Sequence, residues 1–351
     1  MRFRLVLLTM SLLLATHANA ESLYESETPL AVTLNAPLTS ISRAKDSEEN
    51  PYFDSRFELG DANGASSDFF VGVRARGNFR RANCRFLPLQ LNFKKSEVKD
   101  TYLTGQDKLK LVSACRPGQQ FRNWMMLEYL SYKAWALISD YHFRTQLLDV
   151  TYVDTDSGKS RQALAFIIED DGDTAKRLSG GLLKASQGRA SINEEHAALY
   201  ELFQFFIGNN DYSLTKSGPG RPCCHNSRIV DTQAAGHGLV PIPYDFDHAG
   251  IVDAKYARPP DHLMDKIQTV KQRYFTGVCK SSDQVWLSAL ERFKSQREAL
   301  RAVYDDPRLG NRFKRNATKY VDQFFDIADD PAKVKRFILD RCRGAKPQGK
   351  S

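Results

Sequence analysis

The chain of 351 residues has a formal net charge of +8 and is 42% hydrophobic, which is ordinary for a globular protein with a sizeable core. Its basic residues form no dense Lys/Arg run interleaved with aromatic residues, so the composition argues against a nucleic-acid partner. A diffuse basic balance instead suits anionic partners such as nucleotides, phospholipids or cell-wall polymers.

The first 20 residues predict a cleavable secretory signal peptide. Arg2 and Arg4 make its start positively charged, and residues 5–15 form an apolar core. Ala18 and Ala20 are small residues at the positions that signal peptidase recognises. The apolar run is shorter than the roughly 20 residues that span a bilayer, so an uncleaved anchor is the weaker alternative. No later stretch predicts a transmembrane segment. We therefore expect a periplasmic or secreted protein, with a net charge of +6 because cleavage removes two arginines and no acid.

The first half of the chain is rich in strand patterns. Residues 87–93 show the clearest alternation, with the apolar side chains of one face separated by polar ones. Apolar spacing of three and four residues, beginning at Trp124, predicts a helix over residues 123–139. The other strands are expected over residues 30–35, 56–59, 69–76, 109–113, 147–153 and 163–168.

The second half is mainly helical and contains one short hairpin. A capping box at residues 191–194 opens a helix that Gly208 can end, and a polar loop over residues 209–211 follows. Two short strands precede Asp245 and Asp247. Those strands are expected over residues 228–230 and 239–243, and later helices over 283–304, 313–328 and 331–342.

This order of elements predicts an α+β fold with two lobes. Residues 21–170 would form a strand-rich N-lobe with one long helix, and residues 171–342 a helix-rich C-lobe. Residues 343–351 would be a basic flexible tail.

Three polar residues in the second half have the chemistry that phosphoryl transfer needs. One carboxylate must orient the acceptor hydroxyl and accept its proton, while an asparagine and a second carboxylate hold Mg²⁺ against the phosphates. Asp211, Asn226 and Asp245 occur in that order, in loops that flank the predicted hairpin. Magnesium prefers hard oxygen ligands from few side chains together with substrate phosphate. The pattern therefore predicts a Mg²⁺-nucleotide site.

Short motifs between about residues 70 and 255 match motifs of known families. They are Arg76-Gly-Asn78, Lys108-Leu-Lys-Leu111, Arg122-Asn123, Ala165-Phe-Ile-Ile-Glu169, Gly208-Asn-Asn-Asp211, His225-Asn226 and Pro243-Tyr-Asp-Phe-Asp247. These segments resemble the spore-coat CotH-type kinases and, more distantly, the HipA-type kinases, and the resemblance implies a two-lobed protein-kinase-like fold. A closer resemblance is to a family of uncharacterised exported bacterial proteins with the motifs Cys-x-x-Leu-Pro-Leu, Cys-Cys-His-Asn and Pro-Tyr-Asp-Phe-Asp.

The resemblance implies a role for each matching residue. Asp211 would be the catalytic aspartate, and Asn226 and Asp245 would be metal ligands. Asp247 would either bind a second metal ion or hold the ligands of the first in place. The cofactors would be Mg²⁺ and ATP or another nucleoside triphosphate, and the acceptor a hydroxyl in the envelope or outside the cell. The residues on the nucleotide side would be Arg76, Lys110 or Lys94, Glu128 as the partner of one of these lysines, and Glu169 near the base.

Six cysteines remain after signal cleavage, an even number that favours disulfides in an oxidising compartment. Six cysteines allow 15 connectivities. The two-lobed arrangement favours Cys84–Cys115 and Cys279–Cys342, because each pair lies within one lobe. Cys223 and Cys224 are adjacent and either remain reduced or pair differently.

Other interpretations remain open at this point. Residues 209–211 and 76–78 suit ordinary turns, and Asp245 and Asp247 suit a Ca²⁺ site or a helix cap. The whole protein could be a non-catalytic binding protein of the envelope. It could also be a metal-dependent hydrolase that uses His225, His248 and the two aspartates. Zinc binding by Cys223, Cys224 and His225 is disfavoured because structural zinc sites space their cysteines by two to four residues.

Overall fold

The structure is a computed structural model that describes residues 23–60, 66–217, 223–232, 236–279 and 282–343. The predicted signal peptide lies outside the described residues, as does the predicted tail apart from Arg343. The backbone of Arg343 pairs with Val278 in an isolated bridge.

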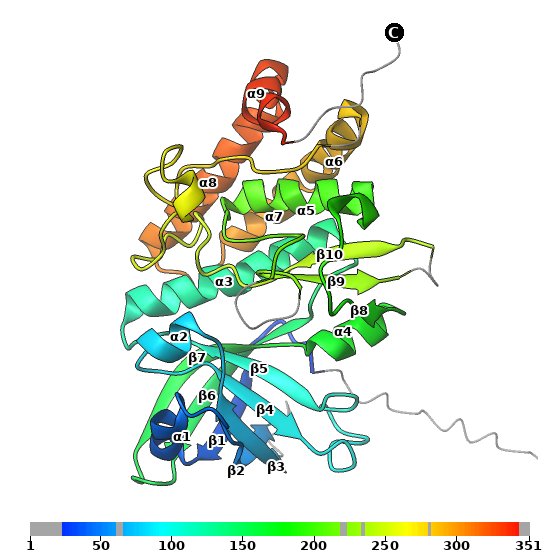
Figure 1. The fold of residues 1–351 in the computed structure, drawn as a ribbon. Coiled ribbons are helices and arrows are strands. Elements are labelled where there is room, and N and C mark those ends of the chain that lie inside the picture. Colours follow the sequence, from blue (N-terminus) through cyan, green and yellow to red (C-terminus); the bar gives the residue numbers. More distant parts are fainter. Residues whose placement is uncertain (1–22, 61–65, 218–222, 233–235, 280–281, 344–351) are drawn as a thin grey trace, which may run out of the picture.

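The first part of the chain forms a closed barrel of seven strands in the order β1-β2-β3-β4-β5-β7-β6 (Figure 1). Neighbouring strands are antiparallel except β1 and β6, which pair in parallel and close the barrel. In β1, Val32, Leu34 and Ala36 are buried in the barrel core, while the residues between them are less buried. The strands are β1 (Leu30–Ala36), β2 (Phe53–Gly60), β3 (Ser66–Ala75), β4 (Leu89–Phe93), β5 (Lys108–Ser113), β6 (Thr145–Asp154) and β7 (Ser160–Ile168).

Helix α3 (Gln119–Ile138) follows β5 and lies between the barrel and the helices of the second half (Figure 1). It is buried on nearly all sides, because barrel strands cover one side and helices α5 and α7 the other. Three shorter helices lie beside the barrel or follow its last strand: α1 (Leu38–Ala44), α2 (Phe79–Asn83) and α4 (Asp171–Arg177).

The second half combines helices with a small antiparallel sheet in the order β10-β9-β8. Its core is continuous with the buried residues of α3. The strands are β8 (Gly181–Leu182), β9 (Ser227–Asp231) and β10 (Leu239–Pro243), and the helices are α5 (Glu194–Ile207), α6 (Asp283–Ser295), α7 (Arg297–Tyr304), α8 (Asn311–Ala328) and α9 (Pro331–Phe337).

The predicted α+β, two-lobed protein-kinase-like fold was wrong. The strands of the first part close into a barrel, because β1 pairs with β6 in parallel more than a hundred residues further along the chain. A strand's alternation shows which face is buried but not which distant strand it meets. The long helix assigned to the strand-rich part belongs instead to the hydrophobic core of the helical half, whereas the barrel strands enclose a separate core.

Three disulfides are present, and they include both predicted pairs, Cys84–Cys115 and Cys279–Cys342. The third joins the adjacent Cys223 and Cys224, so none of the six cysteines is free. Disulfides are typical of proteins that fold in an oxidising compartment. No helix among the described residues is long and apolar enough to cross a membrane.

Candidate functional site

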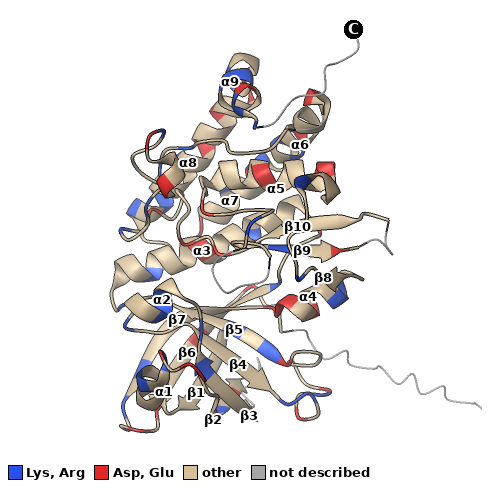
Figure 2. Ribbon diagram, viewed as in Figure 1, with Lys and Arg blue, Asp and Glu red and all other residues tan. Residues whose placement is uncertain are grey.

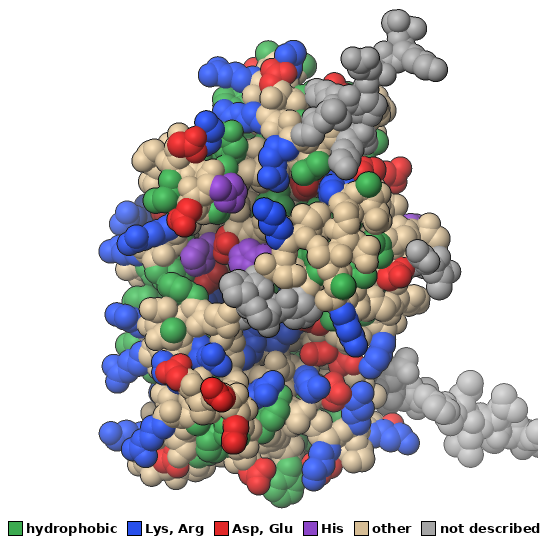
Figure 3. Space-filling model, viewed as in Figure 1, with side chains coloured by type: hydrophobic (Ala, Val, Ile, Leu, Met, Phe, Trp, Pro, Cys, Tyr) green, Lys and Arg blue, Asp and Glu red, His purple; other side chains and the backbone are tan. Residues whose placement is uncertain are grey.

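A pocket with a cavity volume of about 160 Å³ lies where the barrel meets the helical half. Its walls come from the turn after β3, from α3, from the loop after α5, and from the segments that precede β9 and follow β10. Midway along the face shown in Figure 3, histidine side chains gather around acidic ones. The predicted residues that line this pocket are Arg76, Glu128, Asp211, Asn226, Asp245 and Asp247.

Asp211 is fixed by its neighbours in the loop that follows α5. Gly208 ends α5 in the left-handed conformation, as predicted, and a Cβ at this position would overlap the hydroxyl of Tyr320. One carboxylate oxygen of Asp211 lies 2.8 Å from His225 Nε2, and the other accepts from Asn226 Nδ2 at 2.9 Å. Asn226 Nδ2 also donates to the Asp211 carbonyl at 2.7 Å, which leaves its amide oxygen as the atom that could bind a cation.

Asp245 and Asp247 follow β10, at the same end of the hairpin as Asn226, because Ser227 of β9 pairs with Pro243 of β10. Asp245 has a left-handed backbone (φ 62°), and its N–H donates to the hydroxyl of Tyr132 on α3 at 3.0 Å. Asp247 is buried and accepts from Arg80 Nε at 2.9 Å and from the Tyr256 hydroxyl at 3.3 Å. Both aspartates therefore line the pocket, and Asp247 is in addition held in an ion pair with Arg80.

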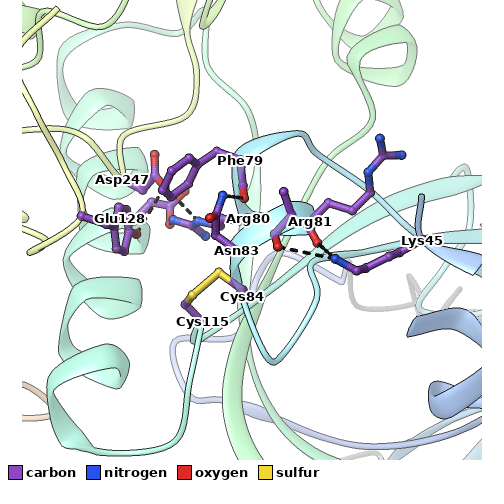
Figure 4. Close-up of a disulfide and its surroundings, with 11 residues drawn as sticks. Lys45, Phe79, Arg80, Arg81, Asn83, Cys84, Cys115, Glu128 and Asp247 are labelled. Carbon is purple, nitrogen blue, oxygen red and sulfur yellow. Dashed lines mark hydrogen bonds and ion pairs between the residues drawn. A yellow bond between two sulfur atoms is a disulfide. The ribbon is translucent and has the colours of Figure 1, made fainter. Parts of the chain in front are cut away.

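Arg80 joins two acidic residues that are far apart in the sequence. Its guanidinium contacts Glu128 of α3 as well as Asp247, as Figure 4 shows. Helix α2, which carries Arg80, is followed directly by Cys84, and the disulfide to Cys115 ties this segment to the loop before α3.

The charges of the pocket are unbalanced in favour of acid. Burial raises the pKa of Glu128 to about 8, although Arg80 acts in the opposite direction. Burial, aided by the Asp247 carboxylate, likewise raises the pKa of Asp245 to about 6. Burial also acts on Asp247, but Arg80 outweighs it and lowers the pKa of that carboxyl. Two arginines cannot keep all of these carboxylates ionised, so a bound cation would stabilise their charged forms.

The available donor atoms fit a hard cation better than zinc. The carboxylate oxygens and the Asn226 amide oxygen are the ligands that Mg²⁺ prefers, with the remaining positions filled by phosphate or water. Among the described residues, no group of three or more His, Cys, Asp or Glu side chains is placed so that it could hold a metal ion, so any cation here would depend on the Asn226 oxygen, phosphate or water as further ligands. The bond between Cys223 and Cys224 removes the thiolates that a zinc site beside His225 would need.

The structure does not bring every predicted residue to this pocket. Lys110 is buried and pairs with Asp171, not with Glu128. Lys94 is exposed just after β4 and pairs with Glu97. Buried Glu169 is engaged by Arg177 at 2.8 Å and by the hydroxyl of Thr174 at 3.0 Å.

Arg76 does line the pocket and donates to the Tyr244 hydroxyl. Arg80 was not predicted from the sequence, although it takes the position expected for a lysine beside Glu128. The spacing Arg76–Arg80 was visible in the sequence, but nothing there shows that residue 80 meets residues 128 and 247. Tyr132 and Tyr244 were missed for the same reason, since their hydroxyls bond to residues of distant segments.

Comparison of the sequence with models of known protein families and with curated proteins found no match. The resemblance to the CotH-type and HipA-type kinases therefore stays a prediction, and the function proposed below depends on the site itself.

Proposed function

We propose that this pocket binds a nucleoside triphosphate together with Mg²⁺ and transfers a phosphoryl group to a hydroxyl acceptor in the periplasm or outside the cell. The observation that carries the proposal is the convergence of Asp211, Asn226 and the Asp245/Asp247 pair, from three separate segments, in one pocket. Phosphoryl transfer depends on positioning and charge stabilisation, and these are the groups it uses.

In this proposal Asp211 accepts the proton of the acceptor hydroxyl. Its two carboxylate oxygens are already oriented by His225 and Asn226, which fixes the direction of its free lone pairs. Asp245 and the amide oxygen of Asn226 would hold Mg²⁺, which offsets the negative charge of the phosphates. Arg80 would keep Asp247 ionised beside them.

The cavity size indicates how a nucleotide would lie. A volume of about 160 Å³ is below the range of about 300–1,000 Å³ that is usual for whole small-molecule ligands. It suits the ion and the phosphates, so the nucleoside would have to extend beyond the cavity.

Nucleotide binding by calorimetry, with and without Mg²⁺, tests the site. We expect micromolar, Mg²⁺-dependent binding that is lost in Asp245→Asn. Asp253→Asn is the matched control, because Asp253 also has a left-handed backbone (φ 51°) and lies outside the pocket, paired with Lys271. Absence of nucleotide binding by folded wild-type protein would leave a non-catalytic binding protein as the better explanation.

Transfer itself is tested separately with Asp211→Asn. This variant should keep nucleotide binding but lose phosphoryl transfer to hydroxyl acceptors by a factor of about 10²–10⁴, the usual contribution of a positioned base. Equal transfer by wild type and Asp211→Asn would remove Asp211 from the proposed role.

A further inference from the structure

A second and larger cavity, of about 380 Å³, lies beside α1. Its walls are α1, the segment between α2 and β4, and the hairpin of β6 and β7. None of the residues that line it belongs to the proposed phosphoryl-transfer pocket.

The wall formed by α1 is fastened at both ends. At its start, the Thr39 hydroxyl donates to Asp154 at 2.6 Å, and the N–H of Ser40 donates to Asp156 at 2.7 Å. Past its end, Lys45 Nζ donates to the Arg81 carbonyl at 2.9 Å (Figure 4). The cavity is therefore part of a fixed structure and does not depend on a loose helix.

The lining is rich in positive charge without matching acid. Arg85, Lys159 and Arg161 line the cavity, and none of them forms an ion pair with another described residue. Asp154 is the acidic residue in the lining, and its two oxygens already accept from Thr39 and Ser157. The lining therefore carries a net positive charge, which suits an anionic ligand.

Arg161 is the most constrained of these cations. Its guanidinium stacks 3.7 Å from the ring centroid of Phe86 and 4.0 Å from that of Tyr152, which fixes the plane of its donors. Burial lowers the pKa of Arg161, as expected for a cation partly removed from water without a carboxylate. A half-buried charge of this kind is costly unless something pairs with it.

We propose that this cavity binds a small carboxylated polyhydroxy ligand, such as a uronic acid unit of an acidic saccharide. The flat guanidinium of Arg161 matches the geometry of a carboxylate, and Lys159 and Arg85 add charge at the exposed rim. The hydroxyls of Thr39, Ser42 and Ser160 also line the cavity and can bond to sugar hydroxyls. The volume falls within the usual range for small-molecule sites.

Calorimetry on the full chain with glucuronate, glucose and inorganic phosphate at constant ionic strength tests this proposal. Glucuronate should bind, and glucose, which lacks the carboxylate, should bind at least about tenfold more weakly, because hydrogen bonds to charged groups are the strong ones. Absence of glucuronate binding would overturn the proposal. Tighter binding of phosphate than of glucuronate would overturn the assignment to a carboxylated sugar.

Matched variants locate the binding. Arg161→Gln should weaken glucuronate binding about tenfold or more, and Lys159→Gln, at the exposed rim, by a smaller factor. Arg74→Gln is the control, because Arg74 also stacks on an aromatic ring, Tyr52 at 4.3 Å, but lies outside the cavity. Equal affinity in the Arg161 and Lys159 variants and in wild type would contradict the assignment. Asp245→Asn should bind glucuronate normally, so the result is independent of the proposed phosphoryl transfer.

Discussion

Asp171 lies between two cations that come from different sheets. Its carboxylate contacts Lys110 of β5 in the barrel and Arg228 Nε of β9 in the small sheet, the latter at 2.6 Å. Figure 2 shows the basic residues of β5 and β9 on either side of the acidic start of α4. Burial acts to raise the pKa of Asp171, but the two cations outweigh it and hold the pKa well below its usual value.

Replacing Asp171 with asparagine should destabilise the protein by about 3–5 kcal/mol near pH 7, because it leaves buried Lys110 and half-buried Arg228 without their partner. The folded-state pKa is below the unfolded value of 3.8, so this stability is present above about pH 4 and is lost as the pH falls further. Urea unfolding at pH 7 and at pH 3 should show the wild-type and variant free energies converging in acid. Asp68→Asn removes an exposed pair with Arg56 and should cost less than about 1 kcal/mol; a similar small loss for Asp171→Asn would contradict this role.

The residues of the candidate site differ in how far the sequence could reveal them. Asp211, Asn226 and Asp245 stand out because polar residues beside turns flank an apolar hairpin, and the structure brings them together. Lys110 was correctly assigned to a strand, but the sequence does not show whether its amine meets Glu128 or Asp171. Such partners are set by tertiary packing between segments more than 50 residues apart.

At the scale of elements, helix α2 depends on contacts outside itself. It has five residues, no side-chain cap and no buried side chain, so its own propensity contributes little to its stability. The Cys84–Cys115 disulfide at its end and the ion pairs of Arg80 hold it in place (Figure 4).

Replacing both Cys84 and Cys115 with serine should lower the free energy of unfolding by about 3–4 kcal/mol, as expected for a bond between residues 31 apart. Amide hydrogen exchange over α2 should also become faster, because the anchor next to it is lost. Unfolding in denaturant and exchange of the oxidised protein measure both effects. The matched variant with serine at Cys279 and Cys342 should leave exchange over α2 unchanged, and equal acceleration in the two variants would argue against a local anchor.

Long elements were predicted from the sequence better than short ones. The helix expected over residues 123–139 is α3, displaced by a few residues at its start, and the hairpin of β9 and β10 was confirmed. The short helices α1, α2 and α4 were missed, because one or two turns carry too little apolar periodicity. The helix expected over residues 283–304 divides into α6 and α7 at Gln296, where no glycine or proline marks the break.

At the scale of the whole molecule, the closure of the barrel is the feature that the sequence patterns do not predict. Strand β1 pairs with β2 nearby and with β6 far along the chain, so both of its edges are used. Each of the seven strands was predicted from the sequence, apart from a few residues at the ends of some strands. The pairing between strands far apart in the chain was not predicted. Local patterns identify strands, whereas the choice of partners depends on the packing of the complete core.

Proline substitutions in β1 test this closure directly, because successive N–H groups of a strand point to opposite neighbours. Thr33 lies opposite Glu58 on β2 and opposite Thr151 on β6. In a closed barrel, Thr33→Pro and Val32→Pro should each lower the free energy of unfolding by about 3 kcal/mol or more, because each removes a hydrogen bond to a neighbouring strand. Val32→Ala measures how much of the effect at residue 32 comes from loss of the valine side chain. If β1 were instead an edge strand, one of the two prolines would be tolerated, because its N–H would face solvent. Denaturant unfolding of the three variants therefore distinguishes a closed barrel from an open sheet.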